Sequence, residues 1–81
     1  MFEQFKKLIC QYVEADEEEI LPSSRFSEEL GFNSYDYMCM LGEAEDEFDI
    51  EIIESEATSI KTVGEMVEYF EVLKNEKNQN T

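Results

Sequence analysis

The chain has 81 residues, which is enough for one small domain. Hydrophobic residues make up 42% of it and aromatic residues 12%, a composition that can build a core and is not typical of a disordered chain. With 21 acidic residues, 6 basic residues and no histidine, the net charge is −15, which disfavours nucleic acids and anionic membranes as partners.

The acidic residues are concentrated in the middle of the chain, where the segment from Phe26 to Glu56 contains no lysine or arginine. A surface of this kind favours partner proteins with basic patches, because complementary charges steer the encounter. The alternative is a solvated face that only keeps the protein soluble. The eleven acidic residues of the segment are Glu28, Glu29, Asp36, Glu43, Glu45, Asp46, Glu47, Asp49, Glu51, Glu54 and Glu56.

The first residues show the spacing of an amphipathic helix of about a dozen residues, with Lys6, Lys7 and Gln11 on the polar face. Four consecutive acidic residues, 16–19, then end the pattern because they repel one another. The apolar face of this predicted helix consists of Phe2, Phe5, Leu8, Ile9, Tyr12 and Val13.

Two cysteines, Cys10 and Cys39, both fall in predicted helices. The chain shows no secretory signal and no apolar run long enough to span a membrane. We therefore expect reduced thiols in a cytoplasmic protein.

A long loop is predicted between the first two helices, around the single proline, Pro22. Ile20, Phe26 and Leu30 are the apolar residues that we expect to anchor this loop in the core. The segment 27–30 combines a serine with two acidic residues, a composition typical of a helix start, and predicts one helical turn.

The second predicted helix runs from about Ser34 to Phe48, since Asn33 and Ser34 are both strong N-cap residues and Gly31 precedes them. Asp36 lies in the first turn, where a carboxylate interacts favourably with the helix dipole. The inward stripe is Tyr37, Met40, Leu41, Ala44 and Phe48, and the outward acidic residues are Asp36, Glu43, Asp46 and Glu47.

After the second helix, Ile50, Ile52 and Ile53 are expected to continue the core, and residues 54–59 to form one weak turn. Residues 62–65 fit a capping box that opens a last helix. The inward side chains of that helix are Val63, Met66, Val67, Phe70 and Leu73.

The pattern predicts an all-α protein, a small bundle of three main helices, because no segment alternates like a strand. The last residues are polar and lack apolar anchors. We therefore expect a single domain over residues 1–74 and a flexible polar tail over residues 75–81.

Three stretches of the chain resemble acyl carrier proteins. The first contains the loop and the helix start, with Pro22, Ser24, Phe26, Glu29, Leu30, Gly31, Ser34 and Asp36. The second is the run from Glu45 to Ile52, similar to the end of that family's second helix, and the third is the opening of the last helix at 60–63. The resemblance extends from about Lys6 to Leu73.

The resemblance implies a four-helix bundle, with three main helices and a short third one. It also implies that Ser34 receives 4′-phosphopantetheine from coenzyme A, through a separate phosphopantetheinyl transferase that uses a divalent metal. The arm would then carry acyl groups as thioesters in fatty-acid, polyketide or related biosynthesis. The chain itself is expected to be non-catalytic, without a bound metal, and monomeric. It has no histidine to activate a serine, so partner enzymes must supply catalysis.

The resemblance further implies that acyl-transferring and condensing enzymes recognise the second helix through basic patches. The residues that this recognition would involve are Asp36, Glu43, Glu45, Asp46 and Glu47, with Tyr35 and Met38 next to the serine.

Three positions near Ser34 differ from the common pattern of the family. Asn33 stands where aspartate is usual, Tyr35 where leucine is usual, and Cys39 where glutamate is frequent. These differences indicate a specialised carrier with its own set of partners.

Several alternatives stay open from the sequence. The chain could be a carrier for aminoacyl or other specialised cargo, or an acidic helical docking module in which Ser34 is only a helix cap. Met38, Met40, Met66 and the isoleucines could admit an acyl chain, or simply fill a closed core. A specific calcium site is disfavoured, because residues 46–56 lack the loop glycine and the carboxylate spacing of such sites.

Overall fold

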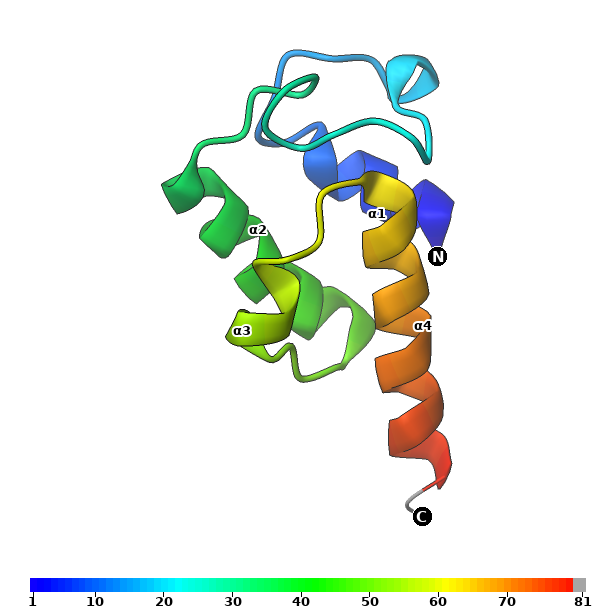
Figure 1. The fold of residues 1–81 in the computed structure, drawn as a ribbon. Coiled ribbons are helices and arrows are strands. Elements are labelled where there is room, and N and C mark those ends of the chain that lie inside the picture. The colour runs from blue at the N-terminus through cyan, green and yellow to red at the C-terminus, as the bar shows by residue number, and fades with distance from the viewer. Residues whose placement is uncertain (80–81) are drawn as a thin grey trace.

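The computed structural model describes residues 1–79, which fold into helices around one core (Figure 1). Within this range there is no strand, only an isolated antiparallel bridge between Arg25 and Thr62. The predicted class is confirmed over residues 1–79: an all-α bundle of four helices, of which the third in chain order is short. The helices are α1 (Phe2–Ile9), α2 (Ser34–Phe48), α3 (Glu54–Ala57) and α4 (Val63–Gln79), with a 3-10 turn at Glu17–Glu19.

Helix α1 contacts both α2 and α4, and it is shorter than the sequence predicts. The chain tightens after Ile9, because the Gln11 and Tyr12 N–H groups donate to carbonyls three residues back, at 3.1 and 2.9 Å. Tyr12 and Val13 still pack against the core, so the apolar spacing continues after the helix has ended. Cys10 consequently lies just past α1 and not inside it.

The core is rich in aromatic side chains. The Phe5 ring meets Phe26 and Phe70 edge-on, with centroid distances of 6.1 and 5.1 Å, and Phe26 meets Phe32 at 5.7 Å. Such pairs add about 0.5–1.5 kcal/mol beyond their burial. The core stripe of α2 is as predicted, with Met40, Leu41, Ala44 and Phe48 buried and Tyr37 partly buried.

The loop before α2 is anchored by Ile20, Phe26 and Phe32, all of which are buried. Leu30, the third predicted anchor, is only partly buried, and its neighbour two residues on takes that place. The helical turn predicted for residues 27–30 is present as a single hydrogen-bonded turn, one residue earlier, at residues 26–29. There the Arg25 carbonyl accepts from the N–H groups of both Glu29 and Leu30, at 3.1 and 3.0 Å, which makes one turn without a following helix.

The same loop caps the start of α4. The Pro22 and Ser24 carbonyls accept from the Gly64 and Val63 N–H groups, at 2.8 and 3.0 Å, and the Phe26 N–H donates to the Lys61 carbonyl at 3.1 Å. The first N–H groups of a helix have no partner within the helix, so these carbonyls satisfy donors that would otherwise need water.

The predicted capping box at α4 is present in a modified form. The Thr62 hydroxyl accepts from the Glu65 N–H at 3.3 Å and donates to a Glu65 carboxylate oxygen at 2.9 Å. In the usual box that carboxylate would reach the N-cap backbone N–H. The box therefore marks the correct helix start, while the acidic side chain holds the hydroxyl.

One of the three core residues predicted in the connection after α2 is wrong. Ile50 is buried and Ile52 is partly buried, but Ile53 is 53% exposed. After the turn that ends α2 at Asp49, the connection is extended, so successive side chains alternate between the core side and the solvent side, and Ile53 lies on the solvent side.

Helix α4 continues through Gln79, past the predicted domain boundary between residues 74 and 75. Extending a formed helix requires little more than compatible residues, which explains why the polar sequence does not end it at once. The expected flexibility of the tail stays a prediction, and residues 80 and 81 lie outside the described residues.

Candidate functional site

Ser34 is the first residue of α2 and its side chain is exposed. The N-cap is Asn33, whose side-chain oxygen accepts from the Asp36 N–H at 2.7 Å. The capping role that one alternative gave to Ser34 therefore belongs to Asn33, while an acidic docking module stays an alternative to the carrier. The serine hydroxyl is presented at the helix start without a capping role.

This cap leads to a stability prediction. Asn33→Ala is expected to lower the free energy of unfolding by about 1 kcal/mol, because the Asp36 N–H loses its acceptor. Asn33→Asp should stay close to the wild type, since aspartate caps equally well. Urea unfolding followed by circular dichroism measures both, and an alanine variant as stable as the aspartate variant would contradict the assigned cap.

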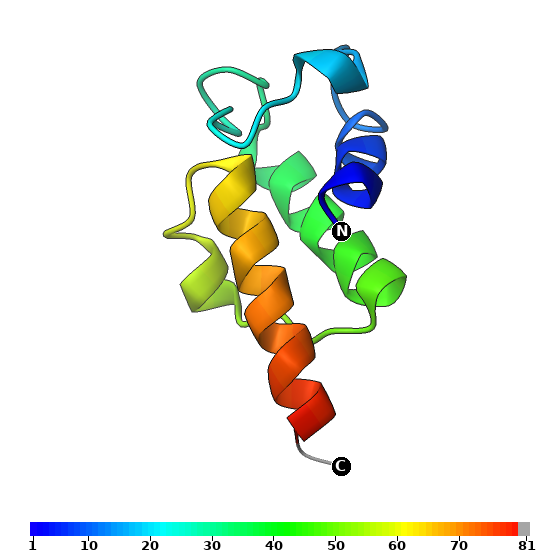
Figure 2. The same cartoon turned by 90° about the vertical axis from the view of Figure 1, so that its right-hand side faces the viewer.

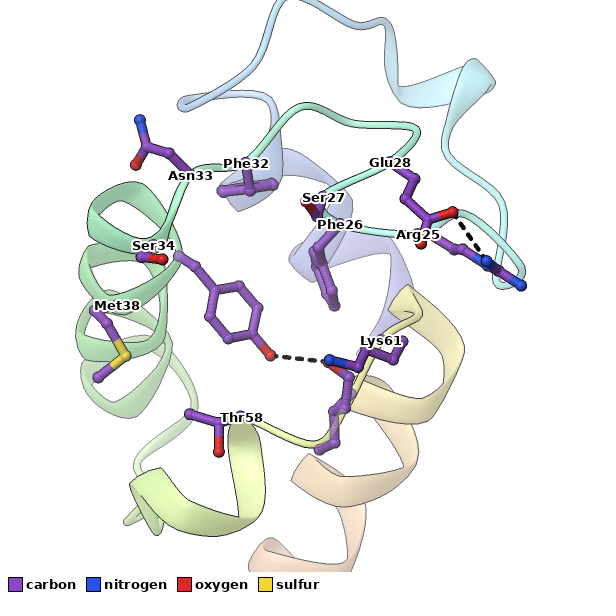
Figure 3. Close-up of a pocket in the computed structure, with 12 residues that line it drawn as sticks. Arg25, Phe26, Ser27, Glu28, Phe32, Asn33, Ser34, Met38, Thr58 and Lys61 are labelled. Carbon is purple, nitrogen blue, oxygen red and sulfur yellow. Dashed lines mark hydrogen bonds and ion pairs between the residues drawn. The ribbon is translucent and has the colours of Figure 1, made fainter.

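A pocket of about 310 Å³ lies beside Ser34. Figure 3 shows Ser34 and Met38 on α2 at one side of the pocket and Thr58, which follows α3, below them. The rings of Phe26, Phe32 and Tyr37 also line it. The volume is at the lower end of that of small-molecule sites, which are about 300–1,000 Å³.

Tyr37 connects the two sides of this pocket. Its hydroxyl donates to the carbonyls of Ala57 at 2.9 Å and Ile60 at 3.4 Å, so α2 is tied to the end of α3 and to the segment that follows. Its ring meets Phe26 edge-on at 5.3 Å. Burial raises the pKa of Tyr37 from 10.0 to about 12.

The raised pKa predicts a loss of stability in alkali. The folded protein holds the Tyr37 proton more tightly than the unfolded chain does, so this contribution is complete below pH 10.0 and is lost toward about pH 12. Urea unfolding of wild type and Tyr37→Phe at pH ~9 and ~11 is the measurement. Wild type should lose more stability between these conditions than the variant, and equal losses would contradict the prediction.

The pocket has lining residues that the sequence did not indicate. Arg25 and Lys61 both line it, and they bring positive charge next to an otherwise acidic helix. Arg25 also forms an exposed ion pair with Glu28 at 2.9 Å, which adds little stability. Thr58 and Ile60 follow α3 in the chain, and no local sequence pattern connects them with Ser34. Phe32 could have been found, since it is an apolar residue two positions before the serine.

Of the residues predicted to contact partners, two near Ser34 on α2 expose large, mainly apolar side chains. Tyr35 is 76% exposed, and Met38 is 37% exposed and lines the pocket. Asp46 and Glu47 are exposed further along the same helix, and Asp36 is partly exposed in its first turn.

The other two predicted contact residues have partners inside the molecule. A carboxylate oxygen of Glu45 accepts from the Ile52 N–H at 2.9 Å, which fixes the connection after α2. Glu43 lies next to Tyr12, where burial and a hydrogen bond with this carboxylate raise the pKa of Tyr12 to about 12. These two residues are thus engaged in the fold as well as partly or fully accessible.

The remaining sulfur side chains divide between core and surface. Met40 and Met66 are fully buried in the core and do not line the pocket, whereas Met38 does. Both cysteines are free thiols and partly buried. The Cys10 thiol donates to the Ala15 carbonyl at 3.2 Å, and burial, with the nearby Glu17 carboxylate, raises the pKa of this thiol.

Two features are absent from the part of the chain that the structure describes. No three histidine, cysteine, aspartate or glutamate side chains in it converge as ligands for a metal ion. Over residues 1–79, no helix combines the length and the apolar character needed to cross a membrane.

Comparison with known proteins agrees with this geometry. The family model described as the phosphopantetheine attachment site matches residues 3–70. A solved structure of the acyl carrier protein from Enterococcus faecalis superposes with a TM-score of 0.78 and is 26% identical, over 89% of this chain and 91% of that one. The predicted family and acyl-carrier-protein-like fold are thereby confirmed, and 4′-phosphopantetheine is the covalent cofactor to be expected. Since the match extends over most of the sequence, this chain belongs to the family of phosphopantetheine-attachment domains.

Proposed function

We propose that Ser34 is the attachment site of 4′-phosphopantetheine and that the protein is an acyl carrier. The observation that carries this proposal is the exposed hydroxyl of Ser34 at the start of α2, directly beside a pocket. The matched range of the family model includes this serine, and the similar solved protein is an acyl carrier protein.

The residues around Ser34 fit a phosphodiester-linked arm. A helix start favours a negative phosphate, because the helix dipole and the first N–H groups point toward it. Asn33 already holds the Asp36 N–H, so the helix start stays formed when Ser34 is modified. When bound, the arm supplies a terminal thiol that holds an acyl group as a thioester.

The chain needs an external enzyme for this modification. A serine hydroxyl is a weak nucleophile without an adjacent base, and the sequence contains no histidine. A phosphopantetheinyl transferase with a divalent metal would supply the base. The protein would itself be non-catalytic and monomeric, and act in the cytoplasm.

The cognate enzymes would dock on α2 through basic patches. Tyr35 and Met38 are three residues apart, so they provide exposed apolar surface on one face of α2. Asp36, Asp46 and Glu47 provide negative charge. Glu43 and Glu45 belong to the same surface, although each also has a partner within the molecule. Enzymes of fatty-acid, polyketide or related biosynthesis are the proposed partners.

The cargo is proposed to be a short acyl group that enters the pocket beside Ser34. The rings of Phe26, Phe32 and Tyr37 provide an apolar lining, while the fully buried Met40 and Met66 do not contribute to it. A longer chain would have to break the hydrogen bonds of the Tyr37 hydroxyl. An aminoacyl or other specialised cargo is the second candidate, because Asn33, Tyr35 and Cys39 depart from the common family pattern.

Intact-mass measurement tests the attachment. The purified protein is incubated with coenzyme A, magnesium and a broad-specificity phosphopantetheinyl transferase, and we expect the mass to rise by one phosphopantetheinyl group. A folded sample that is never labelled, beside a known carrier that is labelled in the same reaction, would favour the acidic docking module instead.

A further inference from the structure

A second apolar surface lies between α3 and the C-terminal half of α4, away from the serine. This α3–α4 groove has a volume of about 450 Å³ and is lined by Ile53, Ile60, Tyr69, Val72 and Leu73, with Glu56 and Glu76 at its edge. Ile53 is 53% exposed and Val72 is 52% exposed, although both are large apolar side chains. Ser34 does not line this groove.

Helix α4 carries this surface as an extra stripe beside its core stripe. Tyr69, Val72, Leu73 and Glu76 are spaced three, four and seven residues apart from the first, so they share one face of the helix. The core stripe, with Met66 and Phe70 among its buried residues, lies on a neighbouring face. Figures 1 and 2 show that the last turns of α4 project beyond the rest of the bundle.

Tyr69 holds the two sides of the groove together. Its hydroxyl donates to a Glu56 carboxylate oxygen at 2.8 Å and accepts from the Ile53 N–H at 3.0 Å. These bonds link α4 to both the start and the middle of α3. The groove is therefore formed before a partner arrives, which lowers the cost of ordering it on binding.

The negative charge around the groove favours a basic partner. Glu56 and Glu76 line it, and no lysine or arginine of the described residues does so. A second copy of the chain, with a net charge of −15, would be repelled. We propose that the α3–α4 groove binds a basic amphipathic helix of a partner protein. The apolar face of that helix would contact Ile53 and Val72, and its lysine or arginine side chains would pair with Glu56 and Glu76.

This docking mode leaves the serine accessible. A partner held in the α3–α4 groove does not cover Ser34. The carrier can therefore stay bound to that partner while an enzyme acts on Ser34 at the start of α2. The proposal does not depend on the phosphopantetheine arm and is tested without it.

The test is a titration of the ¹⁵N-labelled Ser34→Ala protein with a synthetic amphipathic helical peptide of leucine and lysine. Amide shifts should concentrate at Ile53, Tyr69 and Val72. Glu76→Lys and Val72→Lys should each weaken binding about tenfold, because one reverses a pairing charge and the other places a cation in the groove.

Glu71→Lys is the matched control, since Glu71 is exposed on the same helix but does not line the groove. It changes the net charge as much as Glu76→Lys does and should weaken binding less than about threefold, through screened long-range attraction alone. Equal effects of the two charge reversals, or shifts confined to α2, would overturn the proposal.

Discussion

Ser34→Ala is expected to abolish incorporation of phosphopantetheine completely. Alanine has no hydroxyl to form the phosphoester, and the variant should fold normally because the side chain is exposed and Asn33 supplies the cap. The intact mass after incubation with transferase and coenzyme A should therefore stay that of the unmodified chain, while wild type gains one group.

Ser27→Ala is the matched control for this experiment. Ser27 is also exposed and lines the same pocket, so its removal changes the surroundings of the site without removing the proposed acceptor. We expect it to be labelled as wild type is. A labelled Ser34→Ala protein, or a folded Ser27→Ala protein that stays unlabelled, would show that the attachment site is elsewhere.

Gly64→Ala is expected to lower the free energy of unfolding by about 2 kcal/mol, the cost of overpacking a closely fitted contact. A Cβ atom at this position would lie 2.9 Å from the Pro22 carbonyl oxygen and 3.0 Å from the Pro22 Cβ. Backbone atoms cannot move aside as a flexible side chain can, so the loop must shift and stretch the hydrogen bond from the Gly64 N–H. For a domain of this size the melting temperature should fall by roughly 8–16 °C.

Gly42→Ala separates this contact from a general effect of alanine. Gly42 lies within α2, and a Cβ there meets nothing within 4 Å. Alanine is the better helix former by about 0.5–1 kcal/mol, so this variant should be slightly more stable than wild type. Thermal unfolding of both variants decides the matter, and a Gly64→Ala protein as stable as Gly42→Ala would contradict the close approach.

The helical part of the fold follows from local patterns. The periodicity of α2 predicts its limits at Ser34 and Phe48, and the structure has the same limits. Helical spacing and cap residues act over a few positions, so the sequence contains the whole cause. The same spacing overestimates α1, because Tyr12 and Val13 keep the apolar register in a turn that is tighter than a helix.

The errors arise where the outcome depends on backbone geometry or on distant segments. Asn33 and Ser34 are equally good caps by residue type, and only the hydrogen bond to Asp36 distinguishes them. Ile53 has the apolar character of a core residue, but the extended connection before α3 places its side chain on the solvent side.

The pocket illustrates the second kind of limit. Ser34 could be identified from its neighbours, whereas Lys61 and Thr58 reach the site only because Tyr37 ties α2 to the segment after α3. The hydrogen bonds of Tyr37 join residues that are 20 and 23 positions apart in the sequence. A pattern that extends over a few positions contains no information about them.

The bonds from the Pro22 and Ser24 carbonyls to the start of α4 also determine how the molecule opens. A segment without regular structure ordinarily opens alone, and its amide hydrogens exchange early. Here the loop cannot leave without exposing the first turn of α4, so the two form one cooperative unit. The amide hydrogens of Phe26, Val63 and Gly64 should accordingly show the same free energy of opening in hydrogen exchange, and the chain leading to the serine should be as protected as a helix.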